Sequence, residues 1–166
     1  YESAMERGAP IFGELIGYGF SSNGEHISQP NVDGPAKSLE MALKQSGLSA
    51  SDIDYINAHA TSTPAGDVNE GKAILRVFGD KGPFLSSTKS MTGHEMWMAG
   101  ASEVIYSLLM MHNDFLAPNI NLENPDDDIK NLNFVLKTIE RKMDVFLSNS
   151  FGFGGTNSTL IVRKFK

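Results

Sequence analysis

Residues 145–163, VFLSNSFGFGGTNSTLIVR, contain two apolar segments on either side of a glycine-rich turn. The segments Val145–Asn149 and Ser158–Arg163 are rich in the apolar and β-branched residues that favour strands. Gly152–Gly155 supplies the backbone freedom that a turn between them requires. The pattern predicts that the chain ends in two antiparallel strands.

Upstream of this pair, short apolar segments alternate with segments of helical periodicity. Strands are predicted at 11–18, 55–58, 83–88 and 134–136, and helices at 35–45, at 67–78 and from His94 or Glu95 to about Asn113. Alternation of this kind predicts a layered α/β fold with a mixed sheet, which we expect to be five-stranded. The apolar stripe of the third helix is expected to consist of Val104, Ile105, Leu108 and Leu109.

The chain has 166 residues, 40% of them hydrophobic, which suits one globular domain with a core. Its formal net charge of -6 argues against non-specific binding to nucleic acid, and no apolar run is long enough to span a membrane. The lack of cysteine excludes a disulfide scaffold, a thiolate zinc site and cysteine catalysis within the chain. We expect a cytoplasmic protein, and because the chain starts at Tyr1 rather than Met, we expect residues upstream.

Polar clusters follow predicted strands at three places, and ligands of open α/β sheets bind beyond strand ends. In residues 57–67, His59 directly follows a strand and can donate a hydrogen bond, although hydroxyl residues before a proline are equally typical of a capped helix start. In residues 86–94, Lys89 and His94 lie between a strand and a helix, whose dipole would keep the imidazole of His94 neutral and able to stabilise an oxyanion. An anion-binding loop, or a surface lysine beside a packed histidine, is the plain alternative.

The third cluster is the glycine-rich turn itself, within residues 148–157. Its glycines permit unusual backbone angles and expose N–H groups. Phe151 and Phe153 can line an apolar pocket there, although a tight turn held by aromatic packing is the commoner structure.

Together and in this order, the motifs HATSTPAGD (59–67), KSMTGH (89–94) and NSFGFGGTN (149–157) resemble those of the β-ketoacyl-[acyl carrier protein] synthases. These are the condensing enzymes of fatty-acid chain elongation, and the likeness is closest to the elongating type that uses two histidines. It covers essentially the whole chain. It implies a thiolase-like fold in which residues 1–166 form the C-terminal half, and the N-terminal half with the cysteine nucleophile is absent.

The resemblance also implies roles for individual residues. His59 and His94 match the histidines that assist malonyl decarboxylation and stabilise the enolate, and Lys89 matches the lysine that supports them electrostatically. The other matches are buried acidic residues that are structural or ion-binding (Glu70, Glu103), residues that bind the phosphopantetheine arm (Thr61, Thr63) and a gating and oxyanion loop (Phe151, Gly152, Phe153, Gly154, Gly155). No metal or cofactor is implied; the implied partners are acyl carrier protein and, in the full-length protein, a second copy in a homodimer.

The chain departs from the usual family pattern at Ala60, where glycine is common, and at residues 95–98, EMWM, where smaller residues are common. The bulky segment can face an acyl tunnel or a dimer interface, or it can be repacked core, which we expect. Without a thiolate the chain alone is expected to be inactive. The alternatives to a synthase are a non-catalytic partner subunit of the chain-length-factor kind, or a plain α/β binding module with an incidental His/Lys pocket.

Overall fold

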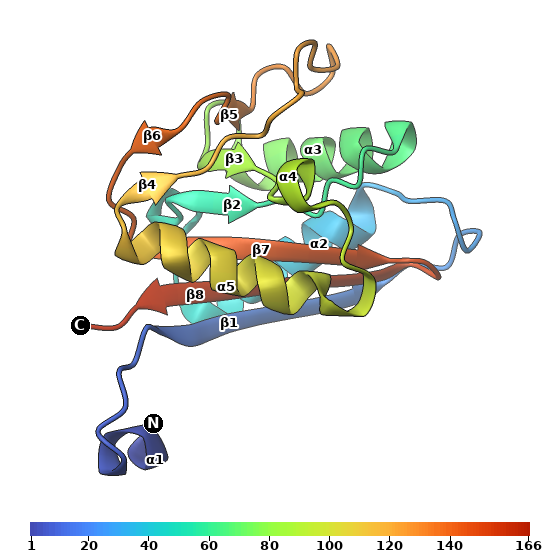
Figure 1. Ribbon diagram of the computed structural model, residues 1–166. Helices are drawn as coiled ribbons and strands as arrows, with labels where there is room; N and C mark the ends of the chain where they lie inside the picture. Colours follow the sequence, from blue (N-terminus) through green and yellow to red (C-terminus); the bar gives the residue numbers. More distant parts are fainter.

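The computed structural model describes residues 1–166 and places a six-stranded mixed sheet at the centre of the molecule (Figure 1). The strands follow the order β1-β8-β7-β2-β3-β5, and β8 alone runs antiparallel to its neighbours. Their bounds are β1 Gly13–Ser22, β2 Tyr55–Asn57, β3 Phe84–Ser86, β5 Asn133–Phe134, β7 Val145–Gly152 and β8 Thr156–Lys164.

The predicted layered α/β fold is confirmed, and the last two strands, β7 and β8, pair antiparallel as expected. The sheet has six strands rather than the expected five, because all six predicted strand segments join it, including the segment predicted at 134–136, which pairs parallel with β3 as β5. Two further strands, β4 (Phe115–Leu116) and β6 (Ile139–Glu140), form a separate small sheet that the sequence pattern did not predict.

Helices cover both faces of the central sheet (Figure 1). α2 (Asp33–Ser46) and α3 (Pro64–Phe78) pack on one face, and α5 (Ala99–His112) packs on the other. The short elements are α1 (Glu2–Glu6), η1 (Ala50–Asp52), α4 (Lys89–Thr92) and η2 (Met96–Met98). No helix combines the length and the apolar character needed to cross a lipid bilayer.

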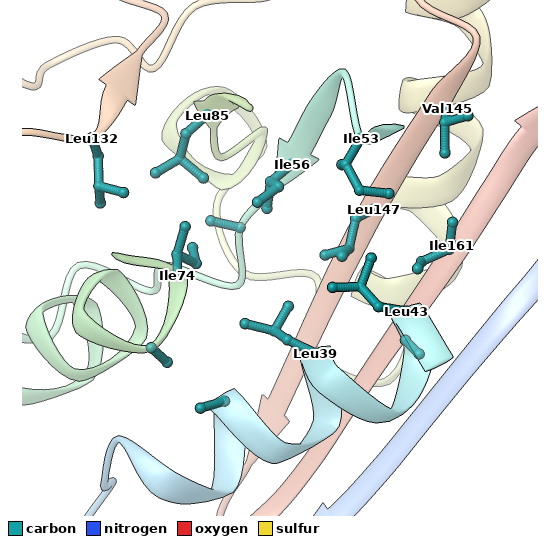
Figure 2. Packing of buried hydrophobic residues seen from close by; sticks show 14 of the residues in the cluster. Leu39, Leu43, Ile53, Ile56, Ile74, Leu85, Leu132, Val145, Leu147 and Ile161 are labelled. Carbon is teal, nitrogen blue, oxygen red and sulfur yellow. The ribbon is translucent and has the colours of Figure 1, made fainter. Parts of the chain in front are cut away.

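Adjacent residues of each central strand enter different cores, because side chains alternate between the two faces of a sheet. Ile56, Leu147 and Ile161 pack with Leu39 and Leu43 of α2 (Figure 2). Their neighbours on the same strands form the second core together with methionines of α5: Tyr55, Phe146, Val162, Met110 and Met111. The sheet is therefore held from both sides, and its strand ends are fixed in place.

Two helix boundaries differ from the prediction. α3 begins at Pro64 rather than near Asp67, because proline suits the first turn of a helix. Residues 90–93, expected to be a loop, lie mostly in α4, and α5 begins at Ala99 rather than at His94 or Glu95. Positive φ angles at Gly93 (75°) and Met96 (55°) interrupt the helical path between α4 and α5.

α5 buries only half of its predicted apolar stripe. Val104 and Leu108 pack against the second core, but Ile105 and Leu109 are 55% and 54% exposed. Ser107 is also buried, and the side-chain amide of Asn57 in β2 donates to its hydroxyl at 3.2 Å. The outward face of α5 is therefore apolar and uncovered in this chain.

Candidate active site

Two histidines meet in a cleft of about 760 Å³ at the ends of the central strands. His59 follows β2 and His94 follows α4, and their ring centroids lie 5.5 Å apart with the rings nearly perpendicular. The ring of Phe151 lies 5.8 Å from the ring of His59. The structure thus brings residues from all three sequence motifs to one place.

Glu70 of α3 holds the turn that carries His59. One carboxylate oxygen accepts the backbone N–H of His59 at 2.9 Å, and the other accepts that of Ala60 at 2.8 Å. The side-chain amide of Asn149 donates to the same carboxylate at 3.0 Å. Ala60 has a φ of 22°, so these bonds stabilise a backbone conformation that glycine adopts at a lower cost in free energy than alanine. Glu70 therefore has a structural role in this turn. Burial raises the pKa of its carboxyl group.

Lys89 and Glu103 form a buried ion pair behind the histidines. Their side chains are 4% and 3% exposed, and Lys89 donates a hydrogen bond to one oxygen of Glu103. Burial raises the pKa of Glu103, and the Lys89 ammonium acts against this effect. Because a buried charge is costly unless it is paired, the two residues depend on each other.

Both histidine rings have features that suit hydrogen-bond donation. Burial, then the charge of Lys89, then the neighbouring His94, lowers the pKa of His59 to about 3, so its ring is neutral near pH 7. The Nδ1 atom of His94 accepts the backbone N–H of Met96 at 3.0 Å, which in a neutral ring assigns the proton to Nε2. The prediction that a helix dipole acts on the ring of His94 is wrong, because α5 begins five residues further on and the dipole acts only within the first turn of a helix.

The glycine-rich turn forms the opposite wall of the cleft. Phe151 and Gly152 end β7, and Phe153 projects from the turn with 84% of its surface exposed. Gly154 and Gly155 have φ angles of 81° and 77°, and the Gly154 N–H donates to the carbonyl of Ile27 at 2.8 Å. The backbone N–H of Phe153 has no acceptor within the chain and is free to bind a ligand oxygen.

The two predicted pantetheine-binding threonines also line this cleft. The hydroxyls of Thr61 and Thr63 lie 3.3 Å apart. Thr63 is the N-cap residue of α3, yet its hydroxyl makes no capping hydrogen bond. Thr63 therefore does not cap α3 through its side chain, and its hydroxyl pairs with that of Thr61 instead.

The bulky segment after His94 is not repacked core, as we had expected. Trp97 is fully exposed, and Met96 and Met98 are 70% and 59% exposed. Sequence reasoning also missed the buried network that supports the site, in which Asn149 accepts a hydrogen bond from Thr159 at 3.0 Å. Asn149, a polar residue within an apolar strand, was the feature of the sequence that could have indicated this network.

No group of three or more histidine, cysteine or acidic side chains is arranged to hold a metal ion. The layered α/β fold with its six-stranded mixed sheet places the chain in the thiolase-like class. Residues 12–123 match the family model for the β-ketoacyl synthase C-terminal domain, and the chain belongs to this family.

The 3-oxoacyl-[acyl-carrier-protein] synthase 1 of Escherichia coli (strain K12) is 49% identical over 165 residues, which cover 99% of this chain and 40% of the relative. The solved ishigamide ketosynthase/chain length factor matches with a TM-score of 0.95 at 38% identity, over 99% of this chain and 41% of that one. A type II polyketide ketosynthase in complex with its acyl carrier protein matches with a TM-score of 0.93 at 35% identity, over 100% of this chain and 42% of that one. This chain thus spans about 40% of the length of the curated relatives that it matches.

Proposed function

We propose that the protein containing this chain is a 3-oxoacyl-[acyl carrier protein] synthase that elongates fatty-acid-type chains. In the proposed reaction the bond between the malonyl α-carbon and its carboxylate breaks, CO₂ leaves, and the electron pair moves into a thioester enolate. The enolate carbon then attacks the acyl thioester on a cysteine outside this chain and expels the thiolate. The observation that carries the proposal is the pair of histidine rings 5.5 Å apart in one cleft.

The residues have distinct parts in this reaction. His59 and His94 donate hydrogen bonds to the malonyl thioester oxygen, where the enolate charge develops. Lys89 favours the neutral form of His59, because a like charge disfavours the imidazolium. The free N–H of Phe153 supplies an oxyanion donor for the acyl thioester. The charge is stabilised by hydrogen bonds alone, so the proposal needs no metal or cofactor.

The proposed substrates arrive on the phosphopantetheine arm of an acyl carrier protein, beside Thr61 and Thr63. The other proposed partner is the N-terminal part of the same protein, because the relatives are longer and α5 presents an uncovered apolar face. Exposed apolar residues of β1 extend the apolar surface: Leu15, Tyr18 and Phe20. We further propose a homodimer located in the cytoplasm for the whole protein.

A non-catalytic partner subunit is the second candidate, favoured by the lack of cysteine in the chain and by its likeness to a ketosynthase/chain length factor. The synthase is better supported, because His59, His94 and Lys89 all remain. A subunit without chemistry has no need of two paired imidazoles beside a buried ammonium.

The test uses the full-length protein with malonyl-acyl carrier protein, and it measures CO₂ release and β-ketoacyl product separately. Replacing His59 or His94 by alanine is expected to slow CO₂ release by about 100-fold or more, as expected for a lost oxyanion donor. His26→Ala, at an exposed histidine, is the matched control and should retain activity. A full-length protein that forms no product, or β-ketoacyl product formed by the 166-residue chain alone, would contradict the proposal.

A further inference from the structure

The segment that carries His94 has few attachments to the rest of the molecule. Among residues 91–98, Glu95 alone is not exposed. The three apolar residues that follow it project into solvent instead of anchoring the segment. The position of His94 therefore depends on a small number of polar contacts.

The main contact is a hydrogen bond to α5. The phenol hydroxyl of Tyr106, eleven residues further along the chain, donates to a carboxylate oxygen of Glu95 at 2.9 Å. This is the one side-chain hydrogen bond that joins residues 94–98 to any other part of this chain. The pair is partly buried, and the hydrogen bond to Glu95 raises the pKa of Tyr106.

The neighbouring backbone shows why such an anchor is needed. Met96 has a φ of 55°, a left-handed conformation that costs free energy for a residue other than glycine. In this conformation the Met96 N–H donates to Nδ1 of His94 at 3.0 Å. A strained residue keeps its conformation only where its surroundings fix it, and Glu95 is the adjacent residue with a fixed side chain.

We propose that Glu95 and Tyr106 act as a positioning clamp that keeps the Met96 N–H on Nδ1 of His94 and thereby holds His94 with its proton on Nε2. The part of the inference that concerns catalysis rests on the proposed role of His94. The part that concerns the proton position does not.

The proton position can be measured without any activity assay. Two-bond ¹H–¹⁵N spectra of ¹⁵N-histidine-labelled full-length protein report which ring nitrogen carries the proton, and the His94→Gln variant assigns the signals. Wild type should show His94 protonated on Nε2. Tyr106→Phe and Glu95→Ala should raise the share of the other tautomer about three- to tenfold, which is the effect of one lost hydrogen bond. Glu95→Gln retains an acceptor oxygen and should resemble wild type.

The rate of CO₂ release should depend on the tautomer of His94. Tyr106→Phe should lower kcat for CO₂ release in proportion to the share of His94 that loses the Nε2 proton in the spectra. It should leave KM within about twofold, because the thioester oxygen loses a donor while substrate binding is retained. Tyr1→Phe removes the hydroxyl of an exposed tyrosine that does not line the cleft and is the matched control. Unchanged His94 spectra in both Tyr106→Phe and Glu95→Ala would overturn the clamp, whether or not the protein proves to be a synthase. The clamp would also be overturned if Glu95→Gln raised the share of the other His94 tautomer as much as Glu95→Ala does.

Discussion

Replacing His59 by glutamine is expected to reduce the loss of folding stability between about pH 7 and about pH 5. Burial, followed by the charge of Lys89 and the neighbouring His94, lowers the pKa of His59 to about 3 in the folded protein. In an unfolded chain the pKa of histidine is about 6.5. Between these values the unfolded state binds a proton that the folded state does not. Stability contributed by neutral His59 is therefore complete above pH 6.5 and declines as the pH falls toward 3.

The size of the effect follows from the two pKa values. Because only the unfolded state binds this proton, the free energy of unfolding of the wild type should fall by about 2 kcal/mol between about pH 7 and about pH 5. Glutamine is neutral throughout this range and has no such proton to bind. The free energy of unfolding of His59→Gln should therefore decline by about 2 kcal/mol less than that of wild type.

Urea unfolding of the full-length protein at both pH values, at one protein concentration, measures this difference. His26→Gln, at an exposed histidine outside the cleft, is the matched control and should follow wild type. If wild type and His59→Gln lost the same stability between the two pH values, the ring of His59 would not be held neutral by its surroundings. The proposed donor role of the neutral ring would lose its physical basis.

Three further perturbations test the support of the site. Lys89→Met leaves the carboxylate of Glu103 buried and unpaired, so urea unfolding should show a loss of about 3–5 kcal/mol in stability. Most of this loss should be recovered when Glu103 is also replaced by leucine. If the stability losses of the two single substitutions simply added in the double variant, the pairing would be contradicted. Gly155→Ala should lower the melting temperature more than Gly154→Ala, because both positions have positive φ but only at Gly155 would a methyl group overlap a backbone oxygen; equal effects would be unexpected. Glu70→Ala leaves three donors without their acceptor and should cost about 3 kcal/mol or more in urea unfolding. Glu70→Gln retains one of the two acceptor oxygens and should cost less, so equal losses would contradict the supporting role of these hydrogen bonds.

The layered fold was predictable because apolar strands and periodic helices alternate in the sequence and glycines end the helices. The buried face of α5 was only partly predictable, because its residues are apolar around most of the helix and the polar Ser107 is buried within it. A strand was predicted at 134–136, but β5 is only two residues long, so its bounds could not be predicted exactly.

The candidate site was predictable as a set of motifs but not as a geometry. The three motifs indicated which side chains to examine, and the structure places His59, His94 and Phe151 together. The clamp between Glu95 and Tyr106 was hidden, because it depends on where the segment before α5 leaves the helical path. Positive φ at a residue such as Met96 has no local sequence signature.

The exposure of His94 gives a physical reason, beyond the lack of a thiolate, to expect no condensation by the chain alone. An oxyanion is stabilised most by donors that water does not reach. His59 is partly buried, but His94 is exposed and the outward face of α5 is apolar and uncovered. In the proposed synthase, the same covering of α5 by the rest of the protein would exclude water from His94. Burial of Ile105 and Leu109 and formation of a dry site would then be one event.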